Sequence, residues 1–393
     1  MMQSREPDAH RNILLLGVVS FINDTSSKII MPLLPLFIAQ QGGTGLAIGL
    51  IAGLSDSIAS ITKLLAGYWS DRLERRKPFV ITGYLFSSVA KLLLAFSVSW
   101  QQTLLLRISE RLGKGLRSAP RDALLAAATH KGNRGRGFGI HRAMDSGGAL
   151  LGTLLVLALY WFADWDFQAI FLFAGLLGFV SLLPLVRVQE SANRKLHRTP
   201  LRLRELPRPL KHFMLIAFTY ALGNFSYMFF ILRAESTFDA RLAVALPLLL
   251  YALYQLSYTL FAIPAGLLSD RIGRRRVLLI GYGLFTLLCL GFLFGSSLSW
   301  LLVLFLLYGI NFAFVNATER ALVADLVSGD ERGTALGTFH MTVSLAALPA
   351  GLLAGLLWDA EPLYTFIAGA LLSAVALLLL ATMPAYEKEE TSV

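Results

Sequence analysis

Apolar segments of about 20 residues recur along the whole chain, and short polar or basic segments separate them. A helix of about 20 apolar residues crosses the hydrocarbon core of a bilayer, whereas a membrane β-strand needs only about 10 residues. The pattern therefore predicts an all-α integral membrane protein. Twelve predicted transmembrane helices cover residues 13–39, 46–70, 78–99, 103–125, 137–162, 167–186, 212–232, 242–268, 277–297, 300–319, 333–358 and 363–383.

The composition agrees with a membrane protein and argues against several other classes. Hydrophobic residues make up 55% of the 393 residues and charged residues 15%, whereas a soluble domain has about 25% charged residues. The only cysteine is Cys289, so the chain has no intramolecular disulfide and no cysteine cluster for a metal. We expect no metal, no cofactor and no enzymatic activity. The first apolar segment lacks a small-residue cleavage site, which favours a retained first helix.

The net charge of +10 follows the orientation rule for membrane proteins. If the N-terminus is cytoplasmic, the inner loops hold most of the loop Lys and Arg residues, and the outer loops hold Arg233 and Arg241. Basic residues concentrate in the cytoplasmic loops of membrane proteins. We therefore expect both termini in the cytoplasm of a multi-pass cell-membrane protein, in the bacterial inner membrane. The charge needs no nucleic-acid partner, and none is expected.

The second half of the chain repeats the first. The segment GYWSDRLERRK at 67–77 returns as GLLSDRIGRRR at 266–276, and NRGRGFGIHRAMDSGGALLG at 133–152 returns as ERGTALGTFHMTVSLAALPAG at 331–351. Halves with an even number of spans are parallel in the membrane. The predicted parts are an N-terminal six-helix bundle at 1–190, a basic cytoplasmic linker at 191–211 and a C-terminal six-helix bundle at 212–393.

Two six-helix bundles with these two loops resemble the major facilitator superfamily, whose loop between helices 2 and 3 has the pattern G-x-x-x-D-R-x-G-R-R. The second loop matches the whole pattern, and the first has Glu74 where the family has glycine. The resemblance implies that the loops hold one conformation, open to the outside. Arg76 and Lys77 are explained by the orientation rule alone. The implied conformational residues are Gly67, Asp71, Arg72, Arg75, Gly266, Asp270, Arg271 and Arg274.

Charged residues inside the predicted spans gather in the first half of the chain. Each charge at the bilayer centre costs at least a few kcal/mol, so such residues pair with one another or mark a functional site. The basic ones are Lys28, Lys63, Lys91, Arg107, Arg111, Lys114, Arg117, Arg121, Arg142 and, in the second half, Arg320. The acidic ones of the first half are Asp24, Asp56, Glu110, Asp122 and Asp145. The first bundle therefore carries an excess of positive charge.

The span at 103–125 has the highest density of charges. On a helix of 3.6 residues per turn, all of its charged residues fall on one face about 140° wide, and Leu105 and Leu112 lie opposite. A helix lying flat on the membrane would show the same pattern, but the repeat partner at 301–317 is plainly a span. We therefore predict that the segment crosses the membrane with its charged face towards a water-filled cavity.

Charges near the predicted cytoplasmic ends of the spans are expected to form structural ion pairs. They are Arg117, Arg121, Asp122 and Arg142, and the matching end of the span at 300–319 keeps Glu319 and Arg320.

In the family, the span that corresponds to 103–125 often carries an arginine linked to proton coupling, in the pattern R-x-x-x-G-x-x-x-G. Here Arg111 replaces the first glycine after Arg107. In the predicted span at 137–162, exporters of the family often carry the pattern G-x-x-x-G-P-x-x-G-G. Here only Gly148 and Gly152 match it, and the proline and the final glycine pair do not.

The second half supplies neutral polar and aromatic side chains. Several of them recur at helical spacing and share a face, although ordinary helix packing explains them equally well. The predicted substrate-binding residues are Arg107, Arg111, Lys114, Lys63, Lys28, Asn224, Tyr251, Tyr254, Gln255 and Asn311. The candidates for proton coupling are Asp24, Asp56 and Glu110. The basic residues of the first half could instead serve only as partners for these acids.

The resemblance and the excess of positive charge favour a secondary transporter. It would move a small anionic or zwitterionic organic solute by rocker-switch alternating access, coupled to protons, and act as a monomer in the lipid bilayer. Arginine suits such a solute because its guanidinium makes two parallel hydrogen bonds to carboxylate or phosphate. The alternative is a proton-driven exporter of drugs or lipophilic compounds, in which the basic face is structural. A membrane enzyme or sensor is disfavoured by the lack of a catalytic motif or a soluble domain.

Overall fold

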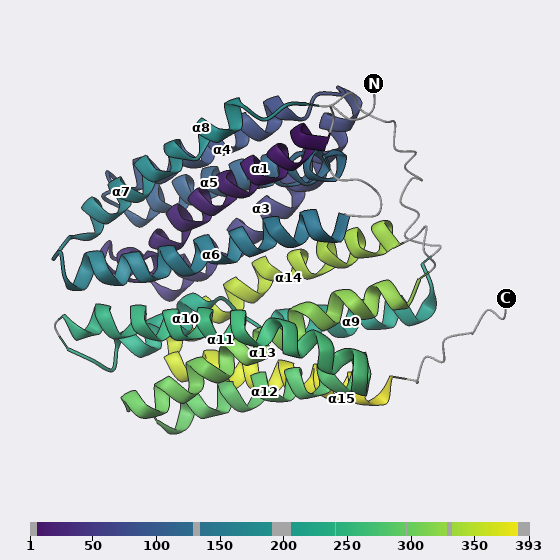
Figure 1. Ribbon diagram of the computed structural model, residues 1–393. Helices are drawn as coiled ribbons and strands as arrows, with labels where there is room; N and C mark the ends of the chain where they lie inside the picture. The colour runs from purple at the N-terminus through teal and green to yellow at the C-terminus, as the bar shows by residue number, and fades with distance from the viewer. Residues whose placement is uncertain are drawn as a thin grey trace. The chain divides into compact units, whose positions relative to one another are not determined.

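The computed structural model describes residues 6–128, 134–190, 206–239, 241–295, 297–327 and 332–383. Most of these residues are helical, and no strand occurs among them (Figure 1). The prediction of an all-α protein is therefore confirmed. Most of the predicted linker, at 191–205, lies outside the described residues, as do residues 1–5 and 384–393.

Eleven helical segments in the described ranges are long and apolar enough to cross a membrane. They coincide with eleven of the predicted spans. The remaining predicted span, at 103–125, forms α5 (Trp100–Ala127), a continuous helix whose charges distinguish it from the others. The chain is thus a multi-pass membrane protein with one unusually charged helix of membrane-spanning length.

By their contacts, the helices form two compact units, Met1–His197 with Ser226–Gln255 and Arg198–Phe225 with Leu256–Val393. The first unit contains α1 (Glu6–Ile30), α2 (Leu34–Gln40), α3 (Gly45–Arg72), α4 (Lys77–Leu94), α5, α6 (Arg134–Trp161), α7 (Phe167–Val180), α8 (Leu182–Val186), α10 (Tyr227–Glu235) and the first part of α11 (Leu242–Ile272). The second unit contains α9 (Arg208–Gly223), the rest of α11, α12 (Arg274–Phe294), α13 (Leu298–Asp325), α14 (Arg332–Ala360) and α15 (Pro362–Thr382).

In the first unit, α6 packs along α1, and Figure 1 shows the two helices side by side. Gly148 and Gly152 of α6 face the α1 backbone at Phe21 and Thr25, where a Cβ atom would collide with carbonyl oxygens. Small residues allow two helix backbones to approach in a membrane protein. Close packing therefore accounts for the two glycines that match the exporter pattern.

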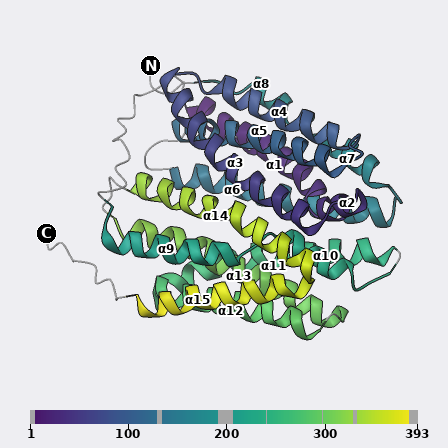
Figure 2. The ribbon, with the colours of Figure 1, turned by 180° about the vertical axis from the view of Figure 1, so that it is seen from behind.

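Helix α5 packs against both α3 and α4, and Figure 2 shows it beside them. A Cβ atom on Gly113 would lie 2.6 Å from the carbonyl oxygen of Gly83 on α4. A Cβ atom on Gly115 would lie 2.6 Å from the carbonyl oxygen of Ala59 on α3. The absence of side chains at Gly113 and Gly115 allows the backbones of α4 and α3 to approach α5 closely, so α5 packs tightly between these two helices.

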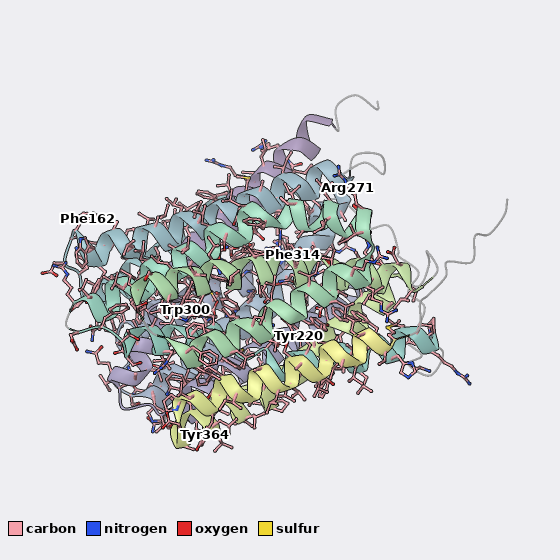
Figure 3. The ribbon with its side chains drawn as sticks, turned by 90° about the horizontal axis from the view of Figure 1, so that it is seen from below. Phe162, Tyr220, Arg271, Trp300, Phe314 and Tyr364 are labelled. Atoms are coloured by element: carbon pink, nitrogen blue, oxygen red, sulfur yellow. The ribbon has the colours of Figure 1, made fainter. Side chains whose placement is uncertain are left out.

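The second unit is held together by aromatic packing and by contacts of α12 with α13 and α15. The rings of Phe292 and Phe366 stack with centroids 4.9 Å apart. Trp300, labelled in Figure 3, lies at the start of α13 and donates from its Nε1 to the carbonyl oxygen of Gly291 at 2.8 Å. The ring stack joins α12 to α15, and the hydrogen bond of Trp300 joins the start of α13 to the end of α12.

The two repeated loops form their Asp–Arg pairs at different positions. In the first loop, Asp71 pairs with Arg76 at 3.2 Å, and the Arg76 side chain is buried. In the second loop, Arg274 lies 2.5 Å from Asp270 and 3.1 Å from Asp325. The expectation that Arg76 only orients the chain is therefore wrong, because a buried and paired guanidinium also joins neighbouring elements.

Both loops turn through a residue with a left-handed backbone. The φ angle is 54° at Glu74 and 96° at Gly273. Glycine adopts positive φ readily, whereas a residue with a Cβ atom is strained there by about 1–2 kcal/mol. The departure from the family pattern at Glu74 therefore leaves the first loop with a strain that the second loop lacks.

We expect Glu74→Gly to raise the free energy of unfolding by about 0.5–1 kcal/mol, because relief of the strain exceeds the entropy that glycine adds to the unfolded chain. The melting temperature of the purified protein in detergent measures this change. Gly273→Ala is the matched control and should lower the melting temperature. A Glu74→Gly protein that melts at or below the wild-type temperature would show that the first loop is not strained.

Candidate binding site

The charged face of α5 points into the first unit, and its apolar face is exposed. Arg107 and Glu110 are each 2% exposed and Arg111 is 7% exposed, whereas Leu105 is 64% exposed. A surface helix of a soluble protein has the opposite arrangement. The prediction that the charged residues share one face is confirmed, and this face is turned towards other helices.

Glu110 lies between two guanidinium groups. Its Oε2 is 2.8 Å from Nη1 of Arg107 and 3.5 Å from Nε of Arg111. The Nε atoms of Arg107 and Arg111 are buried and have no hydrogen-bond partner among the described residues. A buried donor without an acceptor costs about 1–3 kcal/mol. One carboxylate thus serves two arginines, which leaves positive charge and unused donors in the interior.

Lys91 of α4 adds another buried basic side chain. It is 0% exposed, and its Nζ donates to Asn23 Oδ1 at 3.1 Å, Ser26 Oγ at 2.8 Å and Ser27 Oγ at 3.4 Å. These three oxygens satisfy the three donors of an ammonium group. All of them are neutral, so no acidic side chain contacts Lys91 directly among the described residues.

Lys28 of α1 meets the aromatic and amide groups at the start of α11. Its Nζ donates to Tyr251 OH at 3.1 Å and to Gln255 Oε1 at 3.4 Å. It also lies 5.6 Å from the centroid of the Tyr251 ring, within the range of a cation–π interaction. The structure therefore brings together Lys28, Tyr251 and Gln255, three residues of the predicted site.

Tyr227 completes this part of the site, although it is absent from the predicted set. Its ring centroid is 5.3 Å from that of Tyr251, and its hydroxyl donates to the carbonyl oxygen of Met31 at 2.9 Å. Tyr227 and Tyr251 both interact electrostatically with Arg107 and Arg111. The signal in the sequence is the pair Asn224 and Ser226 within the predicted span at 212–232, where the helix breaks before α10 begins at Tyr227.

These residues of the first unit define what we call the basic site. It combines four cationic side chains with one carboxylate and three neutral polar groups. Its members are Lys28, Lys91, Arg107, Glu110, Arg111, Tyr227, Tyr251 and Gln255.

Other predicted site residues lie outside these direct contacts. Lys63, Lys114 and Asp56 are exposed and have no ion pair within the described part of the chain, although Asp56 interacts electrostatically with Arg107 and Arg111. Asp24 accepts a hydrogen bond from Asn23 at 3.3 Å. Tyr254 has its ring centroid 5.5 Å from that of Tyr251. Two predicted residues belong to the second unit, namely Asn224 at the end of α9 and Asn311 on α13.

Asn311 forms hydrogen bonds inside the second unit. Its Nδ2 donates to the carbonyl oxygen of Gly281 at 2.7 Å and to Tyr220 OH at 3.3 Å, and the side chain is 1% exposed. These contacts give Asn311 a place in the core between α9, α12 and α13. Its role in substrate binding stays a prediction.

Arg121 and Arg142 form the expected structural ion pairs, whereas Arg117 has none with any described residue. Arg121 pairs with Asp122 at 3.0 Å and donates to Ser20 Oγ at 3.0 Å. The Arg117 guanidinium lies 4.4 Å from the centroid of the Tyr84 ring. Arg142 of α6 lies 4.0 Å from Asp145. The contacts of Arg121 and Arg117 join α5 to α1 and α4.

The chemistry of the basic site suits recognition of a negatively charged group. The site contains four basic side chains and one carboxylate, which contacts the two guanidinium groups, and its neutral groups are hydroxyls and an amide. No cluster of three or more His, Cys, Asp or Glu residues that could hold a metal ion occurs among the described residues. Membrane-spanning helices around a buried polar site define a polytopic membrane protein, and this arrangement is found in membrane transporters.

Comparison with protein-family models places the chain in one such family. Residues 16–249 and 213–392 each match the model of the Major Facilitator Superfamily. Two matches along one chain agree with the internal repeat. The chain belongs to the major facilitator superfamily and is a membrane transporter of this family.

Similar proteins have varied names. An uncharacterized MFS-type transporter of Methanocaldococcus jannaschii is 45% identical over 375 residues, which are 94% of each chain. The class E tetracycline resistance protein of Escherichia coli is 26% identical over 94% of this chain and 95% of its own. The crystal structure of the nucleoside transporter NupG has a TM-score of 0.79 at 15% identity, with 95% of this chain and 98% of that chain covered. The structural match supports the fold alone.

Proposed function

We propose that the protein transports a small organic anion or zwitterion, which binds at the basic site of the first unit. The observation that carries the proposal is the uneven pairing around Glu110, where one carboxylate faces both Arg107 and Arg111. If the basic residues only neutralised acids, each would have its own carboxylate partner. A carboxylate or phosphate group would supply the acceptors that the buried Nε atoms lack and would offset the remaining charge.

The proposal includes α5 as the twelfth membrane span. The helix has 28 residues, which give a length of about 42 Å at 1.5 Å per residue. Its close packing between α3 and α4 and its exposed Leu105 support a position inside the bundle rather than on the membrane surface. With this span, the chain has six helices per half, 1–190 and 212–393, and both termini lie in the cytoplasm.

Proton coupling and alternating access form the second part of the proposal. Transport of an anion against its gradient needs an energy source, and a proton can accompany the anion and balance its charge. Asp24 and Asp56 stay candidates for the proton-binding group, because neither has an ion pair within the described ranges. Glu110 is less suited, because two adjacent guanidinium groups stabilise its ionised form.

A thermal-stability screen of the purified protein tests anion recognition without knowledge of the natural substrate. We expect glucose 6-phosphate, glycerol 3-phosphate or succinate to raise the melting temperature, because a ligand that binds only the folded state stabilises it. Glucose, glycerol and dimethyl succinate are the matched uncharged controls and should have little effect. Equal shifts with the charged and uncharged member of each pair would contradict a site selected for negative charge.

Export of drugs or lipophilic compounds is the alternative function. It is favoured by the similarity to the class E tetracycline resistance protein along nearly the whole chain. In that case, the buried charges would only stabilise the first unit, and Arg111→Ala would leave drug resistance of an expressing strain intact. Loss of anion binding in the same variant would decide for the first proposal.

A further inference from the structure

A second buried glutamate lies in the second unit, in surroundings opposite to those of Glu110. Glu319 of α13 is 9% exposed, and its Oε1 accepts a hydrogen bond from Tyr282 OH of α12 at 2.9 Å. No ion pair of Glu319 exists with any described residue. The next residue, Arg320, is exposed and donates to Asn316 Oδ1 at 2.9 Å.

A stacked pair of aromatic rings lies beside this carboxyl group. Tyr220 of α9, labelled in Figure 3, stacks on Tyr282 with ring centroids 3.9 Å apart and an interplanar angle of 7°. The titratable groups that interact with Glu319 are Tyr282 from α12, Tyr220 from α9 and Arg320 from α13 itself. The hydroxyl of Tyr220 is bound to Asn311. The one cation in this set is exposed and directed to another acceptor.

The two buried glutamates therefore differ in the form that their surroundings favour. An isolated carboxylate in an apolar interior is costly, and such a group takes up a proton instead, whereas adjacent cations stabilise the ionised form. Glu110 has two adjacent guanidinium groups, and Glu319 has a single tyrosine donor. When two carboxyl groups of one protein are held in such different environments, they suit different roles.

We propose that Glu319, in place of the candidates Asp24 and Asp56, is the proton-binding group of the transporter, and that Glu110 is a fixed partner in the basic site. The proton resides on the Glu319 carboxyl oxygen that Tyr282 does not contact, and Tyr282 donates to the other oxygen in both states. Loss of the proton leaves a charge that burial disfavours, so release requires an arrangement in which water reaches Glu319. This assignment rests on the proposed proton coupling, but the presence of a protonated carboxyl group can be tested without any substrate.

Infrared difference spectroscopy of the protein in liposomes tests the assignment directly, because a protonated carboxyl group has a C=O stretching band that carboxylates and amides lack. We expect the wild type to show such a band, which weakens as the pH is raised and shifts in D2O. Glu319→Gln should abolish the band while it retains the shape of the side chain. Glu110→Gln is the matched control and should leave the band unchanged.

Tyr282→Phe provides a second measurement on a protein that keeps Glu319. Loss of the hydrogen bond from Tyr282 should move the band to higher frequency. The proposal is overturned if the wild type lacks a protonated carboxyl band, if the band persists in Glu319→Gln, or if Tyr282→Phe leaves it unmoved. These outcomes do not depend on transport, so they are distinguishable from a failure of the proposed anion transport.

A transport assay then tests the role in coupling. With whichever of glucose 6-phosphate, glycerol 3-phosphate and succinate is transported, Glu319→Gln should exchange the solute across the membrane at the wild-type rate. Its uptake driven by a pH gradient should fall to the level of protein-free liposomes. If uptake by Glu319→Gln still follows the pH gradient, a group other than Glu319 binds the coupled proton.

Discussion

Arg111→Ala should weaken binding of the transported anion at least tenfold. Truncating one member of a buried, hydrogen-bonded charge pair at a binding interface costs about 2–5 kcal/mol, and 1.4 kcal/mol corresponds to a factor of ten. Arg111 is the better choice for this test because its contact with Glu110 is the longer of the two, 3.5 Å against 2.8 Å. Its removal therefore leaves the Arg107–Glu110 pair in place.

The measurement is the dissociation constant of the stabilising anion, obtained by titration calorimetry with the wild type and the variant in the same detergent. Arg111→Lys should retain part of the affinity, since an ammonium group keeps the charge but loses the paired donors of a guanidinium. Arg187→Ala, which changes an exposed arginine just after α8, is the control for a general effect of charge. Wild-type affinity in Arg111→Ala would exclude Arg111 from the binding site.

Arg107→Ala should destabilise the protein by about 3–5 kcal/mol, because it removes the closest partner of a buried carboxylate. Both side chains of the pair are 2% exposed and their contact is 2.8 Å. The double variant Arg107→Ala/Glu110→Ala should recover part of this loss, since no carboxylate is then left in the interior. Melting curves of both variants in one detergent provide the comparison.

The outcome of this comparison separates a structural pair from independent residues. A double variant less stable than Arg107→Ala would mean that Glu110 is stabilised by other groups, with Arg111 as the nearest one. Equal stability of Arg107→Ala and the wild type would show that the pair contributes nothing to folding. In either case, the assignment of Glu110 as the fixed partner of Arg107 would be wrong.

The helices and the charged face of α5 could be predicted from the sequence because both depend on local periodicity. Long apolar segments have few alternatives in a membrane, and the angular positions of Arg107, Glu110 and Arg111 follow from helical geometry alone. Such inferences need no knowledge of how helices pack. The Arg107–Glu110 ion pair was not predicted, although residues three positions apart lie on one face of a helix.

The partners across helices could not be predicted. Lys91 of α4 is held by Asn23 and Ser26 of α1, which are ordinary polar residues far away in the sequence. Tyr227 joins the basic site because the chain breaks before α10, and a hydropathy pattern does not locate such a break. Glu319 stands beside Arg320 in the sequence, yet on a helix neighbouring residues point in different directions. Its contact with Tyr282 depends on the packing of α12 against α13.

The most direct test of anion transport through the basic site is exchange across the membrane of proteoliposomes. Radiolabelled forms of glucose 6-phosphate, glycerol 3-phosphate and succinate would be compared with their uncharged partners, in vesicles that contain the wild type or Arg111→Ala. The account predicts exchange of at least one anion by the wild type, none of its uncharged partner, and loss of exchange in Arg111→Ala. Exchange of that anion by Arg111→Ala at the wild-type rate would contradict it.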